Sequence, residues 1–454
     1  MQKFLNTMSL RLSVWLSLGA KGSLRSYLVR GTLGSFALNS YGLVLQLVTG
    51  VLLARLLGAA GYGNYAYAMA LIGLMTVPTV MGLPHLIVRN MAVYQAKNEF
   101  SLMRGLLVRG NQAVFLVAIV MSGAALSISL AFAEHFDPSR LHTFLISLIL
   151  LPLLALMNVR MAALRGLRHV VLGIMPDTLI RPTLFVFALS VGIFILPSGL
   201  SAQWVMGFQV SAMAIAFLVG AFFLMRLLPA EAKTVASKYD TGTWLKSALP
   251  FMLLGALQLI NKQTDIVMLG LFRSVQEVGI YRAVVQGAVP VVLVLTVVNT
   301  VLSPTIAELY SRGDRERLQR VVTLSARTIL AGTLPVALVL IFAGEWLLGV
   351  FFGEEFRVGA TALSILCLGQ LINAGMGSVG LILNMTGHER DAAKGIAVAA
   401  VLNIVLNALL IPKFGMEGAA AASGLSLVSW NLLMFYWVCK RIGVVSTAFR
   451  VRSE

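Results

Sequence analysis

Polar and charged residues recur at helical spacing inside one long apolar segment, residues 247–272. Gln258, Asn261, Lys262 and Asp265 occupy positions i, i+3, i+4 and i+7, so they share one face of a helix. A cation held among amide groups can bind a phosphate, and amide groups also suit sugar hydroxyls. A carboxylate buried in an apolar segment can carry a proton or a sodium ion. This face is therefore a candidate binding site.

Other apolar segments carry polar residues of the same kind. The further candidates are Asn39 and Gln46 in segment 33–57, Asp177 and Arg181 in 172–196, Arg327 in 321–345, and Gln370 and Asn373 in 359–384. We expect a hydrated central cavity lined by the first, fifth, seventh and tenth apolar segments. Lys262, Arg181 and Arg327 are its candidate cations for a phosphate group. Asp265 and Asp177 are its candidate carboxylates for ion coupling.

A structural interpretation of the charged residues stays open. Asp177 and Arg181 lie four residues apart, and Lys262 and Asp265 lie three apart, so each pair can neutralise itself on one helix. Such a pair need not bind anything.

The composition shows which kind of protein must position these residues. Of the 454 residues, 58% are hydrophobic and 12% are charged, whereas a soluble protein is ~45–50% apolar and ~25% charged. So few charges cannot cover a water-exposed surface. The sequence therefore predicts an all-α polytopic membrane protein and excludes a single soluble globular domain.

A membrane-spanning helix needs ~20 mostly apolar residues. The runs that meet this condition are 33–57, 64–88, 110–133, 141–164, 172–196, 202–228, 247–272, 280–307, 321–345, 359–384, 392–412 and 417–439. These twelve runs are joined by connections too short to hold a soluble domain.

The basic residues predict the orientation of the chain. Most of the 35 Lys and Arg residues fall on one side if both termini are cytoplasmic, as positively charged loops remain inside. The net charge of +17 then reflects topology and affinity for anionic inner-leaflet lipids, not nucleic-acid binding. Residues 1–30 resemble a basic amphipathic segment on that leaflet.

The longest polar stretch, 229–246, divides the chain into two sets of six segments. The expected organisation is a cytoplasmic segment 1–30, a six-helix bundle 31–228, a cytoplasmic linker 229–246, a second bundle 247–439 and a cytoplasmic tail 440–454. The motif Gly63-Asn64-Tyr65 recurs as Gly279-Ile280-Tyr281, 216 residues later. An even number of helices in each half predicts a parallel repeat about an axis along the membrane normal.

Features of an enzyme are missing from the sequence. It has no phosphate-binding glycine loop of the Walker A type. Its five His residues lack the spacing of metal ligands, and no aqueous domain is available for a nucleotide site. We expect a protein that is not an enzyme and that carries no cofactor or metal.

Three stretches resemble signatures of one transporter family. Residues 264–270 (TDIVMLG) with 277–281 (EVGIY) resemble the middle signature of polysaccharide-transport flippases. Residues 402–420 resemble the C-terminal signature, and 52–65 resemble the N-terminal signature. These flippases belong to the superfamily of multidrug, oligosaccharidyl-lipid and polysaccharide exporters. The resemblance covers nearly the whole chain.

This resemblance implies a V-shaped pair of six-helix bundles that works by alternating access. It implies export of undecaprenyl-pyrophosphate-linked oligosaccharide units, such as O-antigen or exopolysaccharide units, across the cytoplasmic (inner) membrane. The implied partners are the lipid-linked oligosaccharide, a coupling proton or sodium ion, and polysaccharide polymerase machinery. The pathway would be lipopolysaccharide or other polysaccharide biosynthesis.

Two relatives of the same superfamily remain as alternatives. Multidrug and toxin extruders bind organic cations through cavity carboxylates, but segment 33–57 has no acidic residue. Flippases of peptidoglycan lipid precursors have fourteen spans, whereas this sequence shows twelve. Both differences favour a polysaccharide-unit flippase.

The orientation can be tested by cysteine labelling in intact cells with a membrane-impermeant reagent. A cysteine placed at Asp137 or Glu354 should react, because both positions lie in connections expected outside. A cysteine in place of Lys238 should stay unlabelled until the cells are opened. Labelling at position 238 in intact cells would contradict the predicted orientation.

Overall fold

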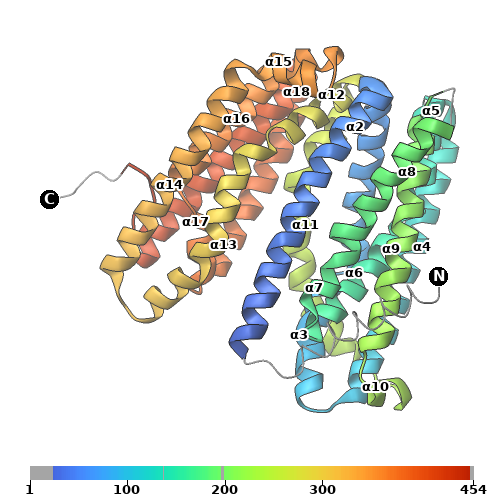
Figure 1. The fold of residues 1–454 in the computed structure, drawn as a ribbon, viewed down its shortest axis with the longest axis vertical. Coiled ribbons are helices and arrows are strands. Elements are labelled where there is room, and N and C mark those ends of the chain that lie inside the picture. Colours follow the sequence, from blue (N-terminus) through green and yellow to red (C-terminus); the bar gives the residue numbers. More distant parts are fainter. Residues whose placement is uncertain (1–23, 136, 196–198, 450–454) are drawn as a thin grey trace.

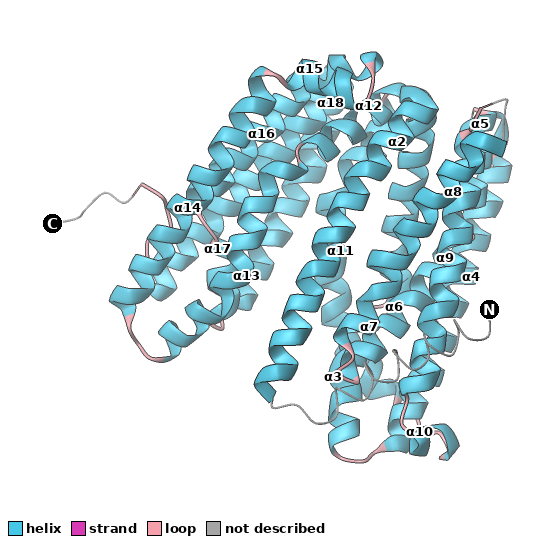
Figure 2. Cartoon of the chain, in the orientation of Figure 1, coloured by secondary structure: helices cyan, strands magenta, loops and turns pink. Residues whose placement is uncertain are grey.

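The computed structural model describes residues 24–135, 137–195 and 199–449. In these ranges the chain is helical with short connections and contains no strand, as Figure 2 shows. The all-α fold expected from the composition is confirmed. Most of the predicted N-terminal amphipathic segment, residues 1–23, lies outside the described residues.

The first half of the chain forms one group of helices. They are α2 (Leu24–Val80), α3 (Leu83–Ala96), α4 (Phe100–Ala131), η1 (Ala133–His135), α5 (Pro138–Ser147), α6 (Leu150–Gly166), α7 (Val170–Met175), η2 (Pro176–Ile180), α8 (Arg181–Ile195) and α9 (Ala202–Leu227). A short helix, α10 (Ala230–Thr234), begins the connection to the second half.

The second half forms the other group. Its helices are α11 (Thr241–Phe272), α12 (Val275–Gly287), α13 (Val289–Ser311), α14 (Arg315–Phe342), α15 (Gly344–Phe351), η3 (Glu354–Gly359), α16 (Ala360–Met376), α17 (Val379–Met385) and α18 (Glu389–Ile442).

Ten helices in the described ranges are long and apolar enough to cross a membrane. Two of them are too long for one crossing: at ~1.5 Å per residue, the 57 residues of α2 and the 54 of α18 would exceed a ~30 Å hydrocarbon core. Each divides at a glycine with positive φ, Gly58 (64°) and Gly415 (56°). Counting these two kinks, the ten helices make the twelve predicted crossings.

Several predicted segments are interrupted helices. Segment 172–196 contains a π-helical turn, η2, between Pro176 and Ile180. Segment 359–384 breaks between α16 and α17 at Gly377, whose φ is 74°. Segment 280–307 breaks at Ala288 between α12 and α13. Apolar periodicity does not register such breaks, because the residues on both sides stay apolar.

The two halves form a V, as Figure 1 shows. They converge at the end that carries α12 and α15 and diverge toward the end that carries α3 and α10. The predicted orientation places the converging end outside. There, Tyr62 of the first half packs edge-on against Phe356 of the second, with ring centroids 6.5 Å apart. Arg140 of α5 donates to the carbonyl of Gly270 in α11 over 2.8 Å.

The two repeated glycine motifs meet at this end. A Cβ on Gly279 would lie 1.9 Å from the carbonyl oxygen of Ala59, and a Cβ on Gly63 would lie 1.9 Å from that of Val275. Each glycine therefore lets the backbone of the opposite half approach closely, as small residues do between membrane helices. This contact explains why both motifs need glycine.

Gly279→Ala should destabilise the protein by about 1–3 kcal/mol, because the added methyl group overpacks a contact with rigid backbone. Thermal unfolding of the purified protein in detergent should show a lower midpoint. Gly207→Ala is the matched control, since a Cβ at Gly207 meets nothing within 4 Å and alanine favours the helix. Equal midpoints for the two variants would refute the close contact.

Candidate functional site

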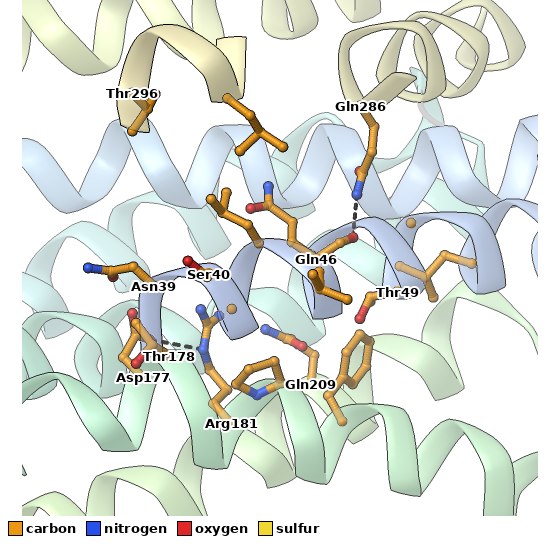
Figure 3. A pocket seen from close by; sticks show the side chains of 18 of the residues that line it. Asn39, Ser40, Gln46, Thr49, Asp177, Thr178, Arg181, Gln209, Gln286 and Thr296 are labelled. Atoms are coloured by element: carbon orange, nitrogen blue, oxygen red, sulfur yellow. Dashed lines mark hydrogen bonds and ion pairs between the residues drawn. The ribbon is translucent and has the colours of Figure 1, made fainter. Parts of the chain in front are cut away.

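A cavity of about 1060 Å³ lies between the two halves. Its walls come from α2, from α7, η2 and α8, and from α9 in the first half, and from α12 and α13 in the second. Figure 3 shows many of the lining side chains. Three of the lining residues are charged, Asp177, Arg181 and Arg282. The charges that face this space therefore sum to one positive unit.

The first-half wall carries an ion pair on an irregular helix. Arg181 Nε lies 2.9 Å from Asp177 Oδ1, as the four-residue spacing suggested. The pair lies on and directly after the π-helical turn η2, which begins at Pro176. Proline removes a backbone donor, and π-helical turns are frequent at functional sites. Both side chains remain about a quarter exposed, so ligands in the cavity can reach them.

The stripe on α2 forms a second part of this wall. Asn39 and Gln46 line the cavity, and both are exposed within the protein fold. Ser40 and Thr49 add hydroxyl groups on the same helix, as Figure 3 shows. The predicted candidates on the first and fifth segments thus lie together.

The second-half wall contains residues that the sequence analysis did not select. Arg282 and Gln286 lie one turn apart on α12 and both face the cavity. The side chain of buried Gln286 donates to the backbone carbonyl of Gln46 and accepts a hydrogen bond from Tyr62 Oη over 3.3 Å. Figure 3 shows Gln286 reaching toward α2.

A sequence signal for this wall was present. Arg282, Gln286, Thr296 and Thr300 fit one helical face if the chain stays helical from α12 into α13. The sequence analysis did not select Arg282, although the predicted segment 280–307 contains it. The structure includes Arg282 in α12, where its half-buried guanidinium faces the cavity.

Three candidates on α11 do not line this cavity. Lys262 and Gln258 are exposed on α11 but are absent from its lining, and Asn261 donates to the carbonyl of Ile396 in α18 over 3.4 Å. Helical spacing correctly places them near one another. It does not reveal that α12, rather than α11, forms the second-half wall.

The other predicted candidates have partners elsewhere. Arg327 donates to the carbonyl of Ala448 over 3.1 Å, so it binds the segment after α18. Asn373 donates to Gln370 Oε1 over 3.1 Å within α16. None of these three residues lines the cavity. The sequence predicted cavity walls from segments 247–272 and 359–384. In the structure, segments 202–228 and 280–307 provide these walls instead.

Asp265 belongs to a separate buried cluster in the second half. Its Oδ2 accepts hydrogen bonds from Tyr281 Oη (2.8 Å) and Ser423 Oγ (2.9 Å). Among the described residues no ion pair joins it to Lys262, so the self-neutralised pair left open by the sequence does not form here: the carboxylate turns toward α12 and α18. Asn403 lies 3.5 Å from Ser423 Oγ, and Asn407 donates to Asn403 Oδ1 over 3.0 Å.

Two acceptor oxygens of this cluster lack a hydrogen-bond donor among the described residues. They are Asp265 Oδ1 and Asn407 Oδ1, and both are buried. Burying a polar atom without a partner is costly. A proton or a cation bound at Asp265 would satisfy its free oxygen.

Residues 28–310 match the model of a family described as polysaccharide biosynthesis protein, which is well over half of the chain. The chain belongs to the polysaccharide biosynthesis protein family. Residues 250–409 also match the MatE family model. The resemblance inferred from the three signatures is confirmed at this level.

Curated relatives of this family member are matched over part of their length. A protein of Haloferax volcanii named as a probable low-salt glycan biosynthesis flippase is 24% identical over 40% of this chain and 38% of its own. An uncharacterized membrane protein of Methanocaldococcus jannaschii is 27% identical over 52% of this chain and 47% of its own. The chain thus spans less than half the length of these relatives in the matched regions.

Solved structures share the fold of this polysaccharide biosynthesis protein. An inward-facing multidrug resistance MATE family transporter of the MOP superfamily has a TM-score of 0.72 and 13% identity, over 88% of this chain and 94% of the other. The lipid II flippase MurJ, in an inward closed conformation, has a TM-score of 0.70 and 14% identity, over 90% and 87%. The chain therefore shares its fold with these two transporters.

Proposed function

We propose that this protein is a flippase that moves undecaprenyl-pyrophosphate-linked oligosaccharide units across the cytoplasmic membrane by alternating access. The observation that carries the proposal is the charge of the cavity: two arginines and one aspartate face it, and amides and hydroxyls surround them. Both termini are proposed to be cytoplasmic, which makes the converging end of the V the outer end.

The cavity chemistry suits a pyrophosphate with sugars attached. Arg181 and Arg282 stand on opposite walls, so a pyrophosphate between them can accept charge-assisted hydrogen bonds from both sides. Asn39, Gln46 and the neighbouring hydroxyl groups provide donors and acceptors for sugar hydroxyls. A volume of about 1060 Å³ is at the upper end of the ~300–1,000 Å³ of small-molecule sites. It therefore accommodates a headgroup, while the lipid tail stays in the bilayer.

The competing substrate class is an organic cation, because the chain also matches the MatE model and shares its fold with extruders. A free carboxylate in the cavity would favour binding of a cationic drug. Here the one lining carboxylate, Asp177, is already paired with Arg181. The cavity therefore favours an anionic ligand, and a lipid-linked glycan is preferred over a drug.

Arg282→Gln and Arg181→Gln should each weaken binding of undecaprenyl pyrophosphate to the purified protein by roughly tenfold or more, since a hydrogen bond to a charged group contributes ~1.5–3 kcal/mol. Both should also reduce surface polysaccharide at matched protein levels. Arg226→Gln is the control, because Arg226 is exposed at the end of α9 and lies over Phe222, outside the cavity.

Unchanged binding in both arginine variants would overturn the pyrophosphate proposal. A deletion strain with normal polysaccharide but altered resistance to cationic dyes would support the extruder instead.

We also propose that Asp265, rather than Asp177, carries the coupling ion, a proton or a sodium ion. The unsatisfied oxygens of Asp265 and Asn407 support this choice. Asp177 already has a cationic partner, which makes binding of a second cation unfavourable. A site inside the second half also leaves the cavity free for the substrate.

A cation that binds only the folded protein stabilises it by an amount that rises with the logarithm of the cation concentration once the site is mostly filled. Raising sodium at constant ionic strength, with choline as the substitute, should raise the unfolding midpoint of the wild type and of Asp177→Asn, but not of Asp265→Asn. If sodium has no effect on any of them, the proton model requires that Asp265→Asn alone abolish the pH dependence of transport. If Asp177→Asn, rather than Asp265→Asn, lost the sodium effect on the unfolding midpoint or the pH dependence of transport, the assignment to Asp265 would be disproved.

A further inference from the structure

The kink in α2 creates a helix start at the converging end, between two membrane crossings. Gly58 has φ 64° and ψ −179°, a conformation that is essentially restricted to glycine. The helix resumes at Ala59, and the first backbone N–H groups of any helix lack partners within it. A side chain just before the helix start usually caps such a group. Glycine has no side chain, so this helix cannot cap itself.

At the equivalent break in the second half, a residue next to the helix start caps the helix. Position 58 corresponds to position 274 under the 216-residue offset of the two glycine motifs. Ser274 precedes α12, and its Oγ accepts a hydrogen bond from the backbone N–H of Glu277 over 3.3 Å. The second half therefore carries its own cap, and the first half does not.

Glu355, from the opposite half, provides the missing cap. The backbone N–H of Ala59 donates to Glu355 Oε2 over 3.0 Å. The other carboxylate oxygen would lie 3.5 Å from a Cβ built on Gly58, so the whole carboxylate faces the kink. A negative charge at a helix N-terminus is favoured by the helix dipole.

The first half in turn provides a positively charged cap for a helix of the second half. Arg55, one turn before Ala59, donates from Nε to the carbonyl of Phe351 over 3.0 Å and from Nη2 to that of Val350. These are the last two residues of α15, where carbonyls lack intrahelical donors and a positive charge is favoured. Each half thus caps a helix end that belongs to the other.

We propose that Arg55 and Glu355 form a clasp that selectively stabilises the state in which the halves are closed at the converging end. Separation of the halves at that end removes both caps at once. The cost falls on the backbone of α2 and α15, because the N–H of Ala59 and the carbonyls of Val350 and Phe351 then lose these partners. Glu355 and Arg55 are positioning residues: they set the balance between the two states of the transport cycle. This inference rests on the alternating access proposed above.

The clasp differs from the glycine contact nearby. Gly63 and Gly279 permit close approach, but van der Waals contact alone does not distinguish one charge state or one partner from another. The clasp makes closure depend on two specific side chains. Conservative substitution of either should therefore shift the equilibrium without changing the fold of either half.

The test measures the separation of the halves directly. Spin labels are placed on exposed cysteines at Glu134 in η1 of the first half and at Lys413 in the second half, two residues before the α18 kink at Gly415. Cys439 is replaced by serine. Double electron–electron resonance on the purified protein in lipid then gives the populations of short and long distances. The wild type should be dominated by the short distance.

Glu355→Ala and Arg55→Gln should each raise the ratio of long to short distances roughly fivefold to tenfold, the size expected for loss of one helix cap. Glu355→Gln keeps an acceptor oxygen without the charge, so it should give a smaller shift and serves if the alanine variant folds poorly. Glu354→Ala is the matched control. Its carboxylate lies next to Glu355 in η3 but pairs with Arg357 of the same half, so the ratio should match the wild type.

Wild-type distance distributions in Glu355→Ala, Glu355→Gln and Arg55→Gln would overturn the clasp. A shift of equal size in Glu354→Ala would also overturn it, because the effect would then be one of general surface charge. The measurement needs no substrate. Its failure, with polysaccharide still lost in Arg282→Gln, would leave the proposed function intact. A clear shift without any polysaccharide defect in Arg282→Gln would support the clasp and refute the substrate assignment.

Discussion

Backbone groups at interrupted helices are the constraint on which this structure depends. Where such groups are buried, each must find a partner inside the protein, because a buried polar group without a hydrogen bond is costly. The chain interrupts its helices at Gly58, Gly377 and Gly415, and each interruption is served by a distant segment. Ala59 is capped by Glu355, and the carbonyls of Ile411 and Pro412 accept from Arg273. These partners join elements that are far apart in sequence.

The break at Gly377 explains the position of the chain after α18. The carbonyl of Met376 accepts from Ser446 Oγ over 3.0 Å, and the carbonyl of Gly375 accepts from the N–H of Ala448 over 3.0 Å. Arg327 in turn binds the carbonyl of Ala448. A cation that looked available for a ligand is thus used to hold a non-helical segment against a broken helix. Residues 443–449 are part of the second half rather than a free tail.

The polar groups inside the protein form two separate sites, the cavity between the halves and the cluster around Asp265. Arg181 and Arg282 line the cavity between the halves, and Arg181 forms an ion pair with Asp177. The cluster around Asp265 lies inside the second half, where Tyr281, Ser423 and Asn403 surround it. Tyr281 belongs to the glycine motif that meets the first half. Its hydrogen bond therefore places the Asp265 cluster next to the contact that closes the converging end.

The sequence by itself determined the fold class, the twelve crossings and the family, because hydrophobic run length and local motifs depend on neighbouring residues alone. It also identified the Asp177–Arg181 pair and the stripe on α2, since residues one turn apart on a helix must face the same way. Tertiary structure decided which stripes meet in one cavity. Lys262, Arg327, Gln370 and Asn373 satisfy the same spacing rules as Asn39 and Gln46, yet they lie elsewhere. Helical periodicity fixes the face of a residue, whereas the rotation and neighbours of each helix follow from contacts across hundreds of residues, such as those of Gln286 and Glu355.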